Sequence, residues 1–418
     1  MYAGGTTPSF RQAHEALAHL ANLPVSIKQV ERVVHAIGGE RCAEREAAVR
    51  AYQELPLAAR KAAPVGVPAP EAVVVQTDGG RLQIRDPRAG PRAPDAGRPE
   101  AAGSDDETPE APGGDNDPGR TNHWREDKVG YLGVIPTPQP TADPCPLIPG
   151  HFVDAVRVSK LAAEIKGPSG ATTGEPPPAS SADVAAAPTD PRYEAPELAR
   201  RSVVATRSPA GAFGAPLSQA AWARGFYAAT RRAFVADGSS TNWGIWCRYF
   251  ASFLPILDFI HALTSVYQAA MAGRSVADGW ADYETWIGQV WAGQIDAVIT
   301  AVKVRQTTLG PKAPDELDTR PRSKVAETVG DLENQKARRN DPAYRAAGLP
   351  ITSCHVESTI KQINQRVKGT ETFWTEAGAE AILQIRADLL SETEPLAAFW
   401  DRRQENQTGE RIQKSLAA

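Results

Sequence analysis

The stretch EAVVVQTDGGRLQIRD, residues 71–86, decides the fold of this chain. Its run of valines at 73–75 predicts a β-strand, and the Asp-Gly-Gly that follows predicts a turn. Asp78 is therefore expected at the end of a strand, with its carboxylate exposed at the edge of a sheet. Taken alone, an Asp-Gly pair is more often a turn than a ligand, because turn chemistry explains both residues.

Working outward, further strands are predicted on the carboxyl-terminal side. EDKVGYLGVI at 126–135 alternates as a strand that should pair with the first, and RRSVVATRS at 200–208 predicts a third. A helix around 218–232 then leads into AFVADGS, whose strand delivers Asp237. Strands first, followed by alternating helix and strand, predict a mixed α/β layer fold.

On the amino-terminal side, residues 9–38 read as two short helices joined by a tight NLPV turn. Ser26 is a good N-cap for the second helix, whose Lys28, Gln29 and Arg32 could face a major groove or phosphates. The pattern suits a DNA-binding helix-turn-helix, and a plain helical hairpin suits it equally. The expected apolar contacts between the two helices are Ala13, Leu17 and Leu20 against Val30, Val33 and Val34.

The chain divides into four predicted regions. Residues 1–62 form the helical, helix-turn-helix-like region, and 63–275 form the first part of a catalytic core. Residues 276–346 read as mostly helical, with Trp280, Trp286 and Trp291 on an apolar seam, and 347–418 close the core with helices. The 35 prolines and 34 glycines gather partly at 86–122 and 165–196, which are expected to be disordered insertions.

Composition limits the classes of function. A formal net charge of −4 argues against a protein that coats DNA nonspecifically, so DNA contacts would come from local basic faces. The 4 cysteines lie far apart without a C-x-x-C pair, which indicates neither a zinc site nor a disulfide framework. Without a long apolar stretch or a signal peptide, we expect no membrane partner and a cytoplasmic location.

Acidic residues are the candidate chemistry. Two strand-borne aspartates, Asp78 and Asp237, together with Glu357 on a helix would make an oxygen-rich pocket suited to Mg²⁺. Two such ions, about 4 Å apart, stabilise both the attacking and the leaving oxygen of a phosphodiester. Asp258 also ends an apolar strand and competes with Asp237 as the second ligand. We favour Asp237, which leaves Asp258 and His261 as accessory residues; His261 suits a structural hydrogen-bonding role equally.

Four segments resemble the motifs of ISKra family transposases. The most specific is GLPITSCHVESTIKQINQRVKGTETFW at 348–374, which resembles the carboxy-terminal signature of the family. ADGSSTNWGIW at 236–246 resembles the second acidic motif, and ILDFIHA at 256–262 resembles the motif that follows it. VVVQTDGGRLQIRD at 73–86, with WREDKVGYL at 124–132, resembles the first. Ser353 and Cys354 stand where the family has serine and glycine.

This resemblance implies an RNase H-like mixed sheet flanked by helices, with an all-helical insertion before the last acid, as in Mutator-like transposases. It implies a DDE-type enzyme that uses Asp78, Asp237 and Glu357 with two Mg²⁺ ions, or Mn²⁺ in their place. The enzyme would cut transposon ends at terminal inverted repeats and join them to target DNA. By analogy, it would act as a homo-oligomer on DNA, associated with the nucleoid.

The helix that carries Glu357 also offers cations to DNA. Lys361 and Lys368 share the face of Glu357, and Arg366 lies near enough to reach a phosphate. A solvated charged face explains the same pattern. Two other functions stay open at this point: a noncatalytic DNA-binding protein derived from a transposase, and a plain RNase H-like nuclease.

Overall fold

The computed structural model describes residues 1–85, 124–169, 171, 193–369 and 372–404. Within these ranges a six-stranded mixed sheet runs in the order β3-β2-β1-β4-β5, and a short β6 also pairs with β1. The first three strands are antiparallel, whereas β4, β5 and β6 run parallel to β1. The strands are β1 (Ala72–Ile84), β2 (Trp124–Val134), β3 (Ala199–Thr206), β4 (Arg231–Ala236), β5 (Leu254–Leu257) and β6 (Phe373–Trp374). The predicted mixed α/β class is therefore confirmed.

Strand β1 is longer than the sequence predicted. It does not turn at Asp78 but continues through Gly79 and Gly80 to Ile84, paired with β2 throughout. The two glycines serve close approach instead of a turn, since a Cβ on Gly80 would lie 2.9 Å from the carboxylate oxygens of Asp127. Asp78 consequently lies inside a strand, and the expectation of a strand end is wrong.

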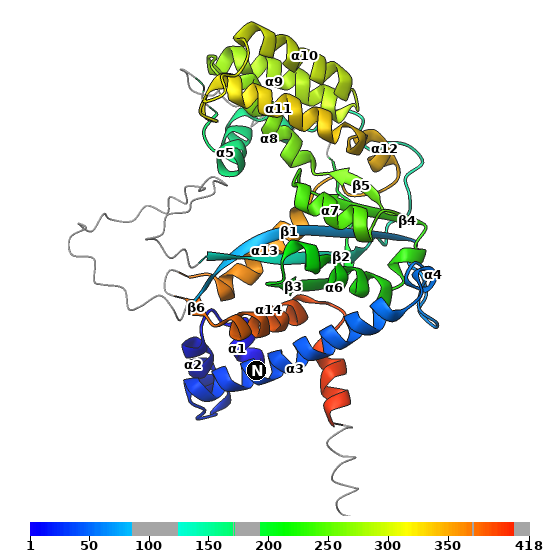
Figure 1. The fold of residues 1–418 in the computed structure, drawn as a ribbon, viewed down its shortest axis with the longest axis vertical. Helices are drawn as coiled ribbons and strands as arrows, with labels where there is room; N and C mark the ends of the chain where they lie inside the picture. The colour runs from blue at the N-terminus through cyan, green and yellow to red at the C-terminus, as the bar shows by residue number, and fades with distance from the viewer. Residues whose placement is uncertain (86–123, 170, 172–192, 370–371, 405–418) are drawn as a thin grey trace, which may run out of the picture.

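Helices cover both faces of the sheet, which explains why β1 begins with consecutive valines instead of an alternating pattern. Val73 and Val75 face a core shared with α6 (Ala210–Ala223) and α7 (Ser240–Tyr249). Ala72 and Val74 face the opposite core, which includes α13 (Cys354–Val367) and α14 (Glu376–Leu390). Figure 1 shows these helices on either side of β1.

The amino-terminal helices pack onto this core. They are α1 (Tyr2–Thr6), α2 (Phe10–Ala21), α3 (Ile27–Glu54) and the short α4 (Leu57–Arg60). Ser26 caps α3 as predicted, in a capping box with Gln29. However, α3 is one helix of 28 residues that runs along α14 (Figure 1), so the prediction of a second short helix is wrong. Two expected contact residues, Leu20 and Val33, are 88% and 44% exposed.

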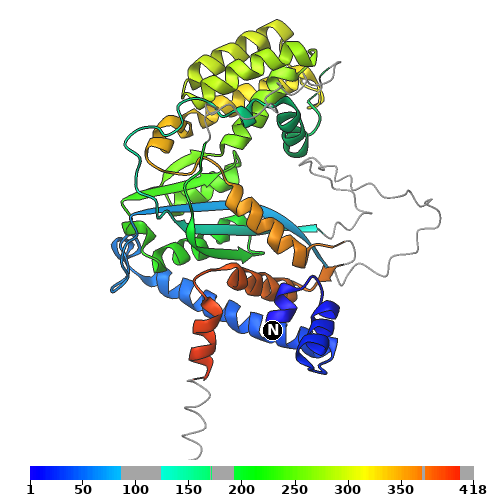
Figure 2. The same ribbon diagram turned by 180° about the vertical axis from the view of Figure 1, so that it is seen from behind.

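A second group of helices lies at the opposite end of the molecule from α3 (Figure 2). We call it the helical lobe: α5 (Ala155–Lys166), α8 (Phe259–Met271), α9 (Val276–Trp291), α10 (Ile295–Leu309) and α11 (Pro321–Gln335). Trp280, Trp286 and Trp291 are buried in its core, as the apolar seam predicted. The chain returns to the sheet through α12 (Asp341–Ala346) and then enters α13.

Residues 395–404 are helical, and short 3-10 turns lie at Gly150–Phe152, Phe226–Ala228 and Lys336–Arg338. The predicted insertion at 86–122 lies outside the described residues, as does most of 165–196. Among the helices that the structure describes, none is long and apolar enough to cross a membrane.

Candidate active site

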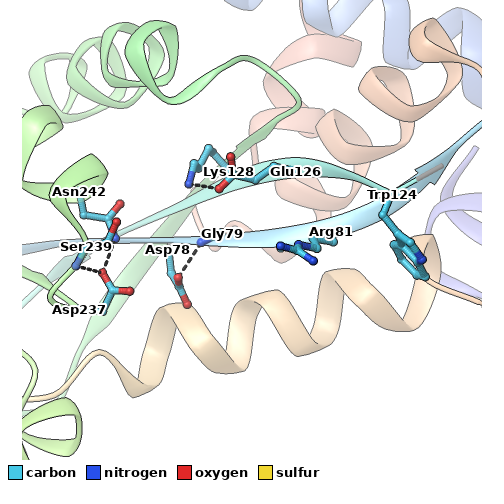
Figure 3. Close-up of a pocket in the computed structure, with 10 residues that line it drawn as sticks. Asp78, Gly79, Arg81, Trp124, Glu126, Lys128, Asp237, Ser239 and Asn242 are labelled. Carbon is cyan, nitrogen blue, oxygen red and sulfur yellow. Dashed lines mark hydrogen bonds and ion pairs between the residues drawn. The ribbon is translucent and has the colours of Figure 1, made fainter. Parts of the chain in front are cut away.

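Asp78 and Asp237 lie opposite each other on the same face of the sheet. The last paired positions of β1 and β4 are Gln76 and Val235, and each aspartate follows its strand's paired residue by two positions. Because side chains alternate along a strand, both carboxylates point to the α13 side. Figure 3 shows Asp78 and Asp237 side by side above that helix. The sheet thus brings together two predicted residues separated by 237 − 78 = 159 positions.

The loop after β4 fixes the Asp237 carboxylate. Its Oδ1 accepts hydrogen bonds from the Ser239 backbone N–H at 3.1 Å and from Asn242 Nδ2 at 2.7 Å. Both donors belong to the first turns of α7, whose N-terminus favours a negative charge. Since both hydrogen bonds end on Oδ1, the carboxylate is held in one orientation.

Glu357 reaches the same region from α13. Buried Gln76, two residues before Asp78 on β1, anchors this helix: its Nε2 donates to the Thr352 carbonyl and its Oε1 accepts from the Val356 N–H, each at 3.0 Å. The Ser353 hydroxyl lies 3.1 Å from Glu357 Oε1 and shares its one proton between this oxygen and Asp258 Oδ2. The first turn of α13, with Glu357, is therefore fixed to the strand that carries Asp78.

Asp258 has a different environment. It directly follows β5, as predicted, but it is only 3% exposed and caps α8. Its Oδ1 accepts from the Ile260 N–H at 2.7 Å, and its Oδ2 accepts from both the backbone N–H and the hydroxyl of Ser353. Burial raises the pKa of Asp258 to about 6. Both carboxylate oxygens are thus engaged by protein donors, one of which also binds Glu357.

The electrostatics of the site are dominated by carboxylates. Burial first, then the negative charge of Asp237 and a smaller effect of Glu357, raise the pKa of Asp78 to about 7. Each of these effects disfavours the charged form of Asp78. A bound cation would offset the negative charges of Asp237 and Glu357, and so would lower the pKa of Asp78. The oxygen-only donor set fits Mg²⁺ or Mn²⁺ chemistry. Even so, no three His, Cys, Asp or Glu side chains of the described residues already lie at metal-binding spacing.

His261 lies behind the Asp237 loop. Its Nε2 is 3.9 Å from Asp331 Oδ2 on α11, and a Cβ on Gly238 would lie 2.9 Å from the same nitrogen. Burial first, then the charges of Lys166 and Arg339, lower its pKa to about 3. His261 is therefore neutral near pH 7, and it contacts the loop residue that follows Asp237.

The residues expected to bind DNA are placed differently from one another. Lys28, Gln29 and Arg32 are exposed on the first turns of α3, and Lys361 and Lys368 are exposed on α13. Arg366, by contrast, is 3% exposed, and its guanidinium donates to the carbonyls of Gly4 and Pro8. It also stacks on the rings of Phe10 and Trp374. The expectation that Arg366 contacts phosphate is therefore wrong, because this side chain ties α13 to α1 and α2.

A cavity of about 460 Å³ opens beside Asp78 and Asp237. Sequence reasoning missed the other residues that line it, which include Arg81, Trp124, Lys128 and Asn242 (Figure 3). Asn242 lies five positions after Asp237 in the segment at 236–246. That segment could therefore have identified Asn242 as a site residue. Arg81 and Lys128 become neighbours only through the pairing of β1 with β2, which the predicted turn at Asp78 did not allow.

Asp127 is the other buried acid near the site. Asp127 lies on β2, opposite Gly80 of β1. It is fully buried, and neither of its carboxylate oxygens accepts a hydrogen bond from another described residue. Burial is the largest of the effects that raise its pKa, to about 6. The strand pairing therefore places this carboxyl group in the interior, where no other residue that the structure describes donates a hydrogen bond to it.

Comparison with known proteins found no match for this chain. No protein-family model matches the chain, and no curated protein is significantly similar to it. The geometry of the site therefore stands on its own.

Proposed function

We propose that the chain is a DNA transposase of the DDE type, with an RNase H-like core that contains Asp78, Asp237 and Glu357 as its acidic triad. The observation that carries the proposal is the convergence of these three acids. One comes from β1, one follows the adjacent parallel strand β4, and one comes from the helix that follows the helical lobe. The negative charges of Asp237 and Glu357 both raise the pKa of Asp78, as expected where carboxylates lie near one another.

The order of strands and helices supports the proposed RNase H-like fold. The central strand is flanked by an antiparallel pair on one side and by two parallel strands on the other. In this arrangement α8, α9, α10 and α11 of the helical lobe, which lie between β5 and α13 in the chain, are the helical insertion expected before the last acid, whereas α5 joins the lobe from between β2 and β3. The resemblance to ISKra family transposases in the four motif segments agrees with both the fold and the triad.

We favour Asp237 over Asp258 as the second ligand. The hydrogen bonds of Asp237 leave its second oxygen available, and the residue lines the cavity. Asp258 is buried, and it holds Ser353, which in turn holds Glu357. Asp258 is therefore a positioning residue for Glu357, and His261 positions the Asp237 loop by filling the space beside Gly238.

The proposed reaction needs no covalent enzyme intermediate. Bound to Asp78, Asp237 and Glu357, Mg²⁺ would supply activation of the attacking oxygen and charge stabilisation of the leaving oxygen. In the first step a water oxygen attacks phosphorus at the transposon end, and the bond to the 3′ oxygen breaks. In the second step the freed 3′ hydroxyl attacks a phosphorus of the target DNA, the bond from that phosphorus to the target's own 3′ oxygen breaks, and the proton lost by the attacking hydroxyl is balanced by one taken up by the displaced oxygen. The protein contributes alignment, through Asn242 on Asp237 and Ser353 on Glu357.

Cleavage of labelled DNA that carries the element's own ends tests this proposal. The wild type should cut in Mg²⁺, and Asp78→Asn, Asp237→Asn and Glu357→Gln should each reduce the rate at least ~100-fold while DNA binding persists. DNA binding without cutting by the wild type would favour a noncatalytic binding protein. Cutting of RNA–DNA hybrids without preference for the ends would favour a plain nuclease.

A further inference from the structure

The cavity beside the acids extends well beyond the space that metal ions need. Its lining follows β1 from Asp78 through Gly79 and Gly80 to Arg81, and reaches Trp124 on β2 (Figure 3). Trp124 pairs with Gln83, five residues beyond Asp78. At roughly 3.3 Å per residue, the two ends of this lining are about 16 Å apart. The cavity is therefore an elongated channel along a strand.

Side chains of β2 lie against the glycines in the wall of this channel. Gly79 lines the cavity, and a Cβ there would lie 3.1 Å from Glu126 Oε1 and 3.2 Å from Lys128 Nζ. Any larger residue would push the Glu126–Lys128 ion pair out of place. Glycine at this position therefore makes room for this ion pair, which lies in the channel wall.

The charges along the channel change sign. Asp78 and Asp237 lie at one end with their carboxylates on the α13 side, whereas Arg81, which is exposed, lies toward the other end and starts from the opposite face of β1. Within the described part of the chain, Arg81 forms no hydrogen bond or ion pair. An Arg with free donors suits a phosphate, which it binds through a planar pair of N–H groups. The carboxylate end, in contrast, suits a cation.

Two further side chains offer contacts to a nucleobase. Trp124 lines the far end of the channel with its aromatic ring, and the Lys368 ammonium lies 5.8 Å from the centre of that ring. Asn242 is only 2% exposed, and its Oδ1 has no hydrogen-bond partner among the described residues. Aromatic rings stack on any base, and a buried amide oxygen accepts a hydrogen bond from a ligand.

We propose that this channel binds an unpaired segment of the DNA strand next to the phosphodiester that is cut, with a backbone phosphate on Arg81 and a base on Trp124. The identity of the strand as DNA rests on the proposed function. A single strand fits better than a duplex, because stacking on the aromatic ring needs an exposed base face. The DNA ends would therefore be melted locally before cleavage.

Fluorescence anisotropy without metal tests this inference directly. The probes are a labelled blunt duplex and the same duplex extended by a few unpaired nucleotides on one strand or the other. The wild type should bind one extended duplex about 10-fold more tightly, and Trp124→Ala should remove most of that preference. Arg81→Gln should lower the salt dependence of binding to that probe by about one phosphate contact, a slope change of ~0.7.

Matched controls keep the outcome clear. Trp400→Ala removes a tryptophan, and Arg50→Gln an exposed arginine, outside the channel, and neither should change the preference. Thermal unfolding of each variant shows whether it folds. If folded Trp124→Ala and Arg81→Gln keep the wild-type preference and salt slope, or if the wild type shows no preference, the inference is overturned. Cleavage without strand preference would overturn this inference alone, whereas strand preference without cleavage would overturn only the proposed function.

Discussion

Gln76 binds Val356 across the boundary between the sheet and α13: its side-chain oxygen accepts the Val356 N–H at 3.0 Å. The Gln76 amide donates in turn to the Thr352 carbonyl. Through this pair of contacts the strand that carries Asp78 determines where the helix that carries Glu357 begins. The acidic site is therefore assembled by buried polar contacts and not by packing alone.

Replacing Gln76 with leucine should lower the free energy of unfolding by roughly 2–4 kcal/mol, because it leaves one buried N–H and one buried carbonyl without partners. Chemical denaturation measures this change. Val74→Leu alters the same face of β1 without removing a hydrogen bond and serves as the control. A loss below about 0.5 kcal/mol for Gln76→Leu would contradict the anchoring role.

Asp127 should make stability depend on pH in an unusual direction. Its pKa is raised in the folded state from 3.8 to about 6, so the folded state binds the proton more tightly than the unfolded state. The resulting stability is complete below pH 3.8 and is lost as pH rises through 6. The upper bound on this loss is about 3 kcal/mol, from 6 − 3.8 = 2.2 pKa units at ~1.4 kcal/mol each.

The change that Asp127→Asn causes in the free energy of unfolding should therefore be more favourable at pH 8 than at pH 4.5, by about 1–3 kcal/mol. Unfolding in denaturant at the two pH values measures the difference between variant and wild type. Asp282→Asn provides a comparison at a half-exposed acid that is paired with Arg274 in the helical lobe. An equal effect of Asp127→Asn at both pH values would show that this carboxyl group is not under strain.

Gly238 and His261 should be energetically coupled. Alanine at 238 would place its methyl group 2.9 Å from His261 Nε2, which costs roughly 1–3 kcal/mol of stability and displaces the Asp237 loop. His261→Ala removes the clash, so the double variant should recover part of that loss. Thermal unfolding of the two single variants and the double variant gives the coupling. Strictly additive effects would argue against the contact.

Arg366 and Lys361 lie on the same helix, but substitution of Arg366 should affect stability and substitution of Lys361 should affect DNA binding. Arg366→Ala removes hydrogen bonds to Gly4 and Pro8, and should cost roughly 2–4 kcal/mol of stability. Lys361→Gln should leave stability within about 0.5 kcal/mol but lower the salt dependence of DNA binding by ~0.9. Denaturation and anisotropy on each variant separate the two roles. A reduced salt slope for a fully folded Arg366 variant would restore its assignment to DNA.

The sequence predicted the main elements of the sheet but not the details that tie them together. Valines 73–75 and the segment around Asp237 were found because β-branched runs mark buried strands. The continuation of β1 past Asp78 was missed, since a Gly-Gly pair indicates a turn unless a partner such as Asp127 needs the space. Arg366 was misjudged because helical spacing does not reveal which face another segment covers, here α1 and α2.

Mn²⁺ binding in the presence of end DNA, counted from the electron paramagnetic resonance signal of the free ion, tests the central claim most directly. Wild-type protein and Asp258→Asn should both bind Mn²⁺, with the second weakened less than 10-fold, whereas Asp78→Asn and Asp237→Asn should lose binding by ~100-fold or more. Retained folding of each variant is checked by thermal unfolding. If Asp237→Asn keeps its affinity while Asp258→Asn loses it, or if the wild type binds no Mn²⁺, then Asp78, Asp237 and Glu357 are not the metal-binding triad.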